Sequence, residues 1–565
     1  MRGRRGARCL GAIAALWAAL ATPTFSPVAA PTPPRIFHVS SRAGSDLDTG
    51  LAPDHAWQTL RRAIGQGLRP GDRVLLRRGD TWRESLKPLA SGTPERPIVF
   101  GAYGAGVLPA ILGSELREGT GHWRENSPSV WYTTGIPHDP GMVFHDGVGS
   151  RRVGSTDQLR ESWDWRYEAR TGRVYMRLGA NPGRHRVEVP QRHGIGFSAA
   201  DHLLVENVEI AFAWTGIGIW GGRGWTIRSV SIHDVVIDGV QGNRGTREVT
   251  VEDSIFQDWG WRSYLLPMSA GETAFGYAIQ VISGASPAPP SDAWRIRGNR
   301  FRLVSLENRG ADATAINVDQ GGHAAVIADN AIEGNRRAGG GGIMVWQPRG
   351  ATSIDISGNS IRDVGSMGIN VSDLGRHRFS APIRIERNRV LNACALDLPD
   401  EEAIRVWTGT ETPVTVATNL VVGTPSGRHP HPGIRLRRSR QVTVVANTVY
   451  GTDAGLEVER GSEVALMRNN ISAGNRVSAM AVEAGSRVRE DYDLLQGPVL
   501  GFTPGPSTRG DDPRFVSPST GDFHLDPASP AVDRGGEVSG FAVDLDGRRR
   551  PAGPGWDIGA YEADR

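Results

Sequence analysis

Polar and aromatic side chains recur at fixed places in short segments of the form Gly/Ala–apolar–x–apolar–x, such as "TAINVD", "GIMVW", "GINVS" and "EAIRVW". In a β-strand successive side chains point to opposite faces, so the apolar pair faces inward and the x residues face outward. If these segments stack, the outward residues form a surface column of aromatic rings, amides, acids and arginines. The predicted binding residues of this column are Trp220, Asn317, Trp346, Asn370, Trp407, Arg435 and Arg437.

Such a column suits a saccharide. The C–H faces of sugars stack on Trp rings, and Arg pairs bidentately with the carboxylate of a uronate. A solvated face without a function rarely exposes several tryptophans. We therefore expect a binding surface for an acidic polysaccharide, with a protein-contact surface and an idle face as the alternatives.

Two kinds of bond cleavage are compatible with these residues. A uronate lyase needs a base for the C5 proton and positive charge beside the carboxylate; because Lys87, the single lysine, lies outside the repeats, His323 or Arg405 would have to act. A hydrolase needs two carboxylates. Asp319 and Asp373 are candidates, two strands apart and so roughly 9.6 Å along the stack. Strict alternation turns Asp373 inward, however, and Asp319 and His323 also suit turns.

A recurring Asn indicates how these segments are arranged. Repeats of this length are typical of a solenoid, in which short strands stack coil on coil into parallel sheets around a shared core. The Asn tolerates the left-handed backbone of a tight turn, and its amide can bond to neighbouring coils. The pattern predicts an all-β parallel β-helix of about ten coils, with a β-sandwich as the alternative. The aligned positions, spaced 22 to 31 residues apart with one gap of 46, are Asn207, Ser229, Asp253, Asn299, Asn330, Asn359, Asn388, Asn419, Asn447 and Asn469.

Both ends of the chain resemble known families. Residues 37–86, with "GSDLDTG", "WQTL" and "PGDRV", are similar to the start of secreted right-handed parallel β-helix proteins of the pectate-lyase-like superfamily, including relatives of chondroitinase B and alginate lyases. Residues 512–562, ending in "DIGAYE", resemble the C-terminal motif called choice-of-anchor Q. The resemblance implies right-handed coils and a polysaccharide lyase, a hydrolase, a uronate epimerase or a non-catalytic envelope or matrix protein.

The N-terminus has the form of an export signal. A basic start precedes the apolar run "CLGAIAALWAALA", which predicts a signal peptide over residues 1–30 with cleavage near residue 21 or 30. Removing its four arginines takes the net charge from +3 to about −1, so the basic composition does not indicate nucleic-acid binding. The mature chain is expected outside the cytoplasm, secreted or periplasmic, without membrane insertion. It keeps one cysteine, Cys394, and so cannot form an internal disulfide.

The remaining boundaries follow from composition. We expect an N-terminal helical cap and first coils over 31–115, a Trp/Tyr-rich β subregion over 116–200, β-helix repeats over 201–490 and the C-terminal segment over 491–565. No cofactor motif is present. The acids of "GSDLDTG" and "DLDG" have calcium-like spacing but no complete calcium loop, so calcium is only an alternative to simple turns. We expect a monomer whose partner is the polysaccharide.

Overall fold

The computed structural model describes residues 33–261, 275–282, 291–304, 312–319, 326–336, 339–346, 353–372, 382–409, 412–423 and 427–563. The predicted signal peptide, His323 and Asp373 lie outside these ranges. Within them, the structure has no helix with the length and apolar character that a membrane span requires.

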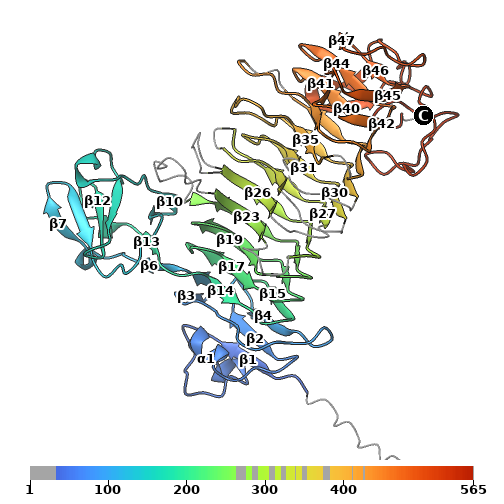
Figure 1. The fold of residues 1–565 in the computed structure, drawn as a ribbon. Coiled ribbons are helices and arrows are strands. Elements are labelled where there is room, and N and C mark those ends of the chain that lie inside the picture. The colour runs from blue at the N-terminus through green and yellow to red at the C-terminus, as the bar shows by residue number, and fades with distance from the viewer. Residues whose placement is uncertain are drawn as a thin grey trace, which may run out of the picture. The chain divides into compact units, whose positions relative to one another are not determined.

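Three parallel sheets, called A, B and C here, follow one another around a coiled stack (Figure 1). A typical coil gives one strand to each sheet in turn, and each strand pairs in parallel with its counterpart in the next coil. This arrangement is a parallel β-helix, as the sequence predicts. The 14 strands of sheet A are β1 (Ile36–Val39), β2 (Arg73–Arg77), β4 (Ile98–Tyr103), β15 (Leu203–Glu206), β18 (Thr226–Arg228), β21 (Thr250–Glu252), β24 (Arg295–Arg297), β27 (Val326–Ala328), β30 (Ile354–Ser357), β33 (Ile383–Glu386), β36 (Val414–Ala417), β39 (Val442–Val445), β42 (Glu463–Arg468) and β45 (Arg487–Asp491).

Sheets B and C are built in the same way. The 13 strands of sheet B are β3 (Thr81–Trp82), β5 (Ala110–Leu112), β16 (Glu209–Ala211), β19 (Ser231–Val235), β22 (Ile255–Trp259), β25 (Arg300–Arg302), β28 (Ala331–Glu333), β31 (Ser360–Arg362), β34 (Arg389–Leu391), β37 (Leu420–Val422), β40 (Thr448–Tyr450), β43 (Ile471–Ala473) and β46 (Leu494–Leu495). The 12 strands of sheet C are β14 (Ile195–Ser198), β17 (Ile217–Trp220), β20 (Val240–Asn243), β23 (Phe275–Ile282), β26 (Asp312–Asp319), β29 (Ile343–Trp346), β32 (Ile369–Ser372), β35 (Ile404–Trp407), β38 (Ile434–Arg437), β41 (Ala454–Glu459), β44 (Ser478–Val482) and β47 (Val499–Leu500).

Branched apolar side chains fill the interior of the stack. Alternation along each short strand places Ile and Val inward, where they pack against the same positions of the coils above and below. The inward residues of one coil, all at most 1% exposed, are Ile354, Ile356, Ile361, Ile369 and Val371. The period-2 prediction for this segment is confirmed.

Asparagines at the turn between sheets A and B form a bonded ladder. Asn330 Nδ2 and backbone N both donate to Asn359 Oδ1, at 2.9 and 3.1 Å, and Asn359 bonds Asn388 in the same way. Each Nδ2 also donates to a backbone carbonyl, for example Asn359 to Ile327 O at 2.8 Å. The predicted stacking of Asn330, Asn359 and Asn388 in neighbouring coils is therefore confirmed.

The predicted register is one residue early in four coils. There the aligned residue has a positive φ of 50 to 60°, and the next residue occupies the ladder position. Asn470, not Asn469, accepts from Asn447, and Asn299 Oδ1 accepts from the backbone N of Ser254. The residue with the left-handed backbone comes one position before the residue that bonds in the ladder. The alignment of the sequence repeats treated these two neighbouring positions as one. The four misaligned positions are Asn207, Ser229, Asp253 and Asn469.

The two ends and one insertion complete the fold. At the start, α1 (Leu60–Ile64) buries Leu60 and Ala63 in the core, and Trp57 precedes it. The C-terminal segment includes the antiparallel pair β48 (Phe515–Ser517) and β49 (Asp522–Leu525). The insertion between β5 and β14, called the subregion here, has two antiparallel sheets, one of β6 (Ser114–Leu116), β9 (Phe144–His145), β10 (Val148–Gly149) and β13 (Val187–Pro190), the other of β7 (Arg124–Ser127), β8 (Val130–Thr133), β11 (Trp165–Glu168) and β12 (Arg173–Arg177).

Candidate active site on sheet C

The outward side chains of sheet C form two rows across successive coils. In row one, Asn317, Met344, Asn370, Arg405 and Arg435 follow each other in direct register. Neighbouring strands of a sheet lie about 4.8 Å apart, so each row offers one side chain at that interval.

Row two runs beside row one. Asp319, Trp346, Ser372 and Trp407 follow each other in direct register, from β26 to β35. Asp319, Trp346 and Trp407 are half-buried. Alternation thus places the predicted residues of these strands on one face, with a carboxylate next to an aromatic ring.

Two buried amides in row one lack hydrogen-bond partners. Asn317 and Asn370 are 0% and 1% exposed, and among the described residues neither Oδ1 nor Nδ2 of either side chain has a partner. The Oγ of Ser372 and the Nε1 of Trp407 are also buried and have no partner in the part of the chain that the structure describes. A buried polar group without a hydrogen bond costs about 1–3 kcal/mol. These groups make this face of sheet C the candidate site, because a polar ligand is one source of the missing hydrogen bonds.

The arginines of row one belong to a cluster of buried ion pairs. Arg405 donates to both carboxylate oxygens of Glu402, and Arg435 Nη1 donates to the same carboxylate at 3.2 Å. Arg435 Nε donates to Glu457 at 2.8 Å, in the next coil. Protein carboxylates therefore hold the guanidinium groups that the sequence analysis assigned to a uronate.

Arg437 is engaged in the same way. Its Nη2 and Nη1 donate to Asp400 at 2.6 and 2.9 Å, and its Nε donates to Glu459 at 2.9 Å. The hydrogen bond from Arg437 holds the pKa of Asp400 below its usual value, whereas burial raises the pKa of Glu457. Three arginines and four carboxylates close this end of the rows, which leaves no excess positive charge among the described groups of the cluster.

The other end of row one carries a carboxylic acid that the sequence analysis missed. Asp238 lies two residues before β20; its Oδ2 accepts from Gln241 at 2.8 Å, and Gln241 also donates to Gln280 at 2.8 Å. Burial raises the pKa of Asp238 to about 7. Glu402 stands at the same place, two residues before β35, so an acid at this position of the repeat was the available signal.

Trp220 is the most open of the predicted tryptophans, 37% exposed. It lies on β17, with the Phe197 ring at 4.7 Å and the Arg244 guanidinium at 4.1 Å from its own ring centroid. Two strands of sheet C, β20 and β23, lie between it and Asp319 along the stack. The structure thus places Trp220 on the same sheet as the amides but in a separate aromatic group.

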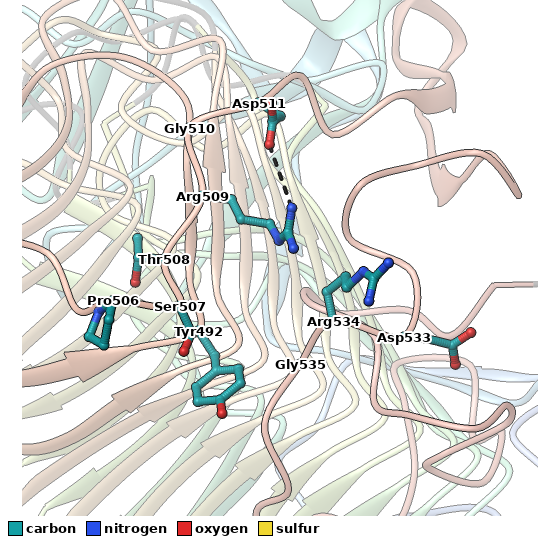
Figure 2. A pocket seen from close by; sticks show the side chains of 10 residues that line it. All are labelled: Tyr492, Pro506, Ser507, Thr508, Arg509, Gly510, Asp511, Asp533, Arg534 and Gly535. Carbon is teal, nitrogen blue, oxygen red and sulfur yellow. Dashed lines mark ion pairs between the residues drawn. The ribbon is translucent and has the colours of Figure 1, made fainter.

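Away from sheet C, a hollow of about 710 Å³ lies where Tyr492 and residues 506–511 face residues 533–535 (Figure 2). Its walls carry two arginines and two aspartates, and the one ion pair drawn spans 4.0 Å. The guanidinium of Arg468 covers the Tyr492 ring at 4.6 Å. This hollow therefore offers less stacking surface to a sugar than the tryptophans of row two.

A metal site has no support among the described residues, which contain no group of three or more His, Cys, Asp or Glu side chains arranged to hold an ion. The predicted catalytic residues Asp373 and His323 lie outside those residues, so both stay predictions from the sequence. The structure brings Asp319, Trp346, Asn317 and Asn370 together on adjacent strands.

Comparisons with known proteins agree with this fold. Residues 215–421 match the model of the right-handed beta helix region, and no curated protein matches the chain. The structure is similar to that of XylC in complex with xylose, with a TM-score of 0.56 and 14% identity over 94% of this chain and 99% of the other. It is also similar to a structure described as a glycoside hydrolase, with a TM-score of 0.51 and 12% identity over 81% and 96%. At these identities the likeness shows the fold alone, a right-handed parallel β-helix.

Proposed function

We propose that this protein binds an uncharged saccharide chain across β26, β29, β32 and β35 and hydrolyses a glycosidic bond there. The observation that carries the proposal is the pair of buried amides, Asn317 and Asn370, whose polar atoms have no partner among the described residues. An amide both donates and accepts, as sugar hydroxyls do. The half-buried ring of Trp346, in the adjacent row, supplies a surface for a C–H face of the sugar.

The proposal names an uncharged saccharide because the arginines are already paired. The expectation of an acidic polysaccharide depended on free guanidinium groups at Arg405, Arg435 and Arg437. Each of them bonds protein carboxylates instead. Binding a uronate there would have to break buried ion pairs, which costs more than an exposed arginine would require.

Hydrolysis is favoured over elimination for the same reason. A lyase needs positive charge to stabilise the carbanion formed beside the uronate carboxylate, whereas a hydrolase needs a carboxyl group on each side of the scissile bond. Asp319 supplies one carboxylate of the site, and Asp373 stays the predicted second. The xylose complex of XylC and the glycoside hydrolase, which share this fold, are consistent with a sugar as the ligand class. We further propose that the predicted export signal delivers the protein outside the cytoplasm.

The experiment offers the purified protein a panel of xylan, cellulose, pectin and alginate fragments. We expect new reducing ends from an uncharged glycan, without the ultraviolet-absorbing unsaturated ends that elimination leaves. Trp346→Ala should lower affinity for that glycan about tenfold, since one aromatic stacking contact contributes about 0.5–1.5 kcal/mol. Unsaturated ends from pectin or alginate would overturn the choice of hydrolysis.

A glycan-binding protein without catalysis is the competing function. The same unpartnered amides support it, because they explain binding and leave the bond cleavage to Asp319. Asp319→Asn separates the two functions. If the wild type releases reducing ends and Asp319→Asn binds without releasing them, the protein is a hydrolase; if both bind and neither cleaves, it is a binding protein.

A further inference from the structure

A hollow of about 420 Å³ lies between the subregion and the coils. Its subregion side is formed by His138, Asp139, Gly141 and Arg152, and its coil side by Trp214, Val236 and Ile237. Trp214 lies three residues before β17, and Ile237 lies three residues before β20. The hollow therefore sits next to the strands that begin sheet C, two to three coils before the first strand of the rows described above.

The polar side of the hollow is held in place by protein contacts. Arg152 Nη2 donates to Asp139 Oδ2 at 2.6 Å, and the backbone N of Gly141 donates to Asp139 Oδ1 at 2.9 Å. The backbone of His138 bonds the amide of Gln191 in both directions, at 3.2 and 2.9 Å. A fixed polar edge opposite an apolar wall is the arrangement that binds a sugar, whose ring has hydroxyls at its edge and C–H groups on its faces.

Aromatic rings connect this hollow to sheet C. The ring centroids of His138 and Trp214 are 5.8 Å apart, those of Trp214 and His193 5.7 Å, and those of His193 and Phe197 5.0 Å. The series continues from Phe197 to Trp220 at 4.7 Å. Trp214, His193 and Phe197 are half-buried and Trp220 is exposed. We call these five rings the aromatic track.

His193 gives the track a polar member. Its Nδ1 is buried without a hydrogen-bond partner among the described residues, and burial lowers the pKa of the imidazole, which keeps it neutral near pH 7. A neutral imidazole can donate one hydrogen bond and accept another. The track therefore combines stacking faces with an unused polar atom beside Trp214.

We propose that the hollow and the aromatic track form a distal binding site for the same uncharged saccharide chain, so that long chains bind more tightly than short ones. The proposal rests on the function proposed above and adds the chain-length specificity of that site. Three rungs, about 14 Å, separate Trp220 on β17 from Asn317 on β26. A disaccharide at Asn317 and Asn370 stays away from the track, whereas a longer oligomer reaches it.

The test compares xylobiose with xylohexaose, and cellobiose with cellohexaose, in calorimetric titrations of the full chain carrying Asp319→Asn to prevent turnover. Trp214→Ala and Phe197→Ala are added separately. We expect each substitution to weaken binding of the hexasaccharide about tenfold, because one stacking contact is lost. The affinity for the disaccharide should change by less than about twofold. Tyr132→Ala, which removes a half-exposed ring on β8 of the other subregion sheet, is the matched control and should change neither.

Trp214 packs between the subregion and the coils, so its removal could loosen the subregion. Asp139→Asn keeps the volume of the side chain and alters only the polar edge; we expect it to weaken hexasaccharide binding about threefold, through one hydrogen bond. Two results would overturn the distal site and leave the proposed site on sheet C unaffected. One is equal affinity for the disaccharide and the hexasaccharide in the chain that carries Asp319→Asn alone. The other is an equal loss of affinity for both saccharides when Trp214→Ala or Phe197→Ala is added. Failure of every oligosaccharide to bind would instead overturn the proposed function and this inference with it.

Discussion

Asparagine is buried in two regions of this molecule with opposite results. In the ladder, Asn359 accepts from Asn330 and donates to both Asn388 and Ile327 O, so its amide is bonded on both sides. On the outward face of sheet C, Asn370 is equally buried, and its amide has no partner among the described residues. The residue type is the same and the burial is the same, so the difference comes from the neighbours.

The neighbours differ because of the order of residues along each row. The ladder repeats Asn in every coil from Asn299 to Asn447, so the next amide is always one rung away. In row one, Met344 stands between Asn317 and Asn370. The two amides are therefore two rungs apart, about 9.6 Å, too far to bond each other. Repetition of Asn produces a bonded structural element, and its interruption leaves two amides without a partner among the described residues.

The strongest way to sharpen this comparison is to remove one partner from a carboxylate that is now fully paired on the same outward face. Arg405→Met removes the hydrogen bonds to both oxygens of Glu402, which is 0% exposed. Glu402 keeps one hydrogen bond, from Arg435 Nη1 at 3.2 Å. We therefore expect the free energy of unfolding to fall by about 3 kcal/mol, the upper end of the range for hydrogen bonds to a charged group. Denaturant titration measures it, and the double variant Arg405→Met/Glu402→Leu should recover part of the loss. A change below about 0.5 kcal/mol, the usual range for surface substitutions, would show that the cluster is not buried in solution.

The ladder itself provides the next test. Asn359→Ala deletes one amide, which removes the acceptor of the Asn330 backbone N and one hydrogen bond each from Asn330 Nδ2 and the carbonyl of Ile327. At about 1–3 kcal/mol for each unsatisfied buried group, we expect a loss of about 2–4 kcal/mol in the free energy of unfolding. Val390→Ala, at an inward position of sheet B, is a control for cavity formation with a similar cost and no polar group. If Asn359→Ala leaves the free energy of unfolding unchanged, the ladder does not stabilise the fold.

The smallest effect on stability is expected at Asn370. Asn370→Ala breaks no hydrogen bond among the described residues and removes a buried amide that has no partner there, so the free energy of unfolding should stay the same or rise by about 1 kcal/mol. Affinity for the saccharide should fall about three- to tenfold, as expected for lost hydrogen bonds. The comparison breaks if Asn370→Ala destabilises the protein as much as Asn359→Ala, because Asn370 would then be a structural residue.

The sequence predicted what depends on local periodicity. Alternation placed Asn317, Trp346, Asn370 and Trp407 on the outward face, and the Asn spacing predicted the stack. The one-residue error at Asn469 arose because a left-handed turn residue and a ladder residue are both often Asn. Local pattern could not separate the two roles.

The ion pairs of row one were beyond prediction for a different reason. Arg435 donates to Glu402, which lies 33 residues earlier in the turn before β35. It also donates to Glu457, which lies 22 residues later in the following coil. The path of that turn over the sheet decides which carboxylate pairs with which guanidinium. The alternation of residues along a strand carries no information about that path. The expectation of an acidic substrate stays a prediction, because a free arginine and a paired one look alike in a sequence.

The regular spacing of the ladder also means that one coil can be removed without changing the register of the others. Asn330 and Asn359 are 29 residues apart, as are Asn359 and Asn388, so residues 330–358 amount to one complete turn of the stack. Excising them would join Asn299 to Asn359 in the ladder and discard β29 together with Met344. Asn317 and Asn370 would then become adjacent rungs and bond each other. A whole-coil deletion is thus a route by which this architecture pairs polar groups that now have no partner among the described residues, without a single new residue.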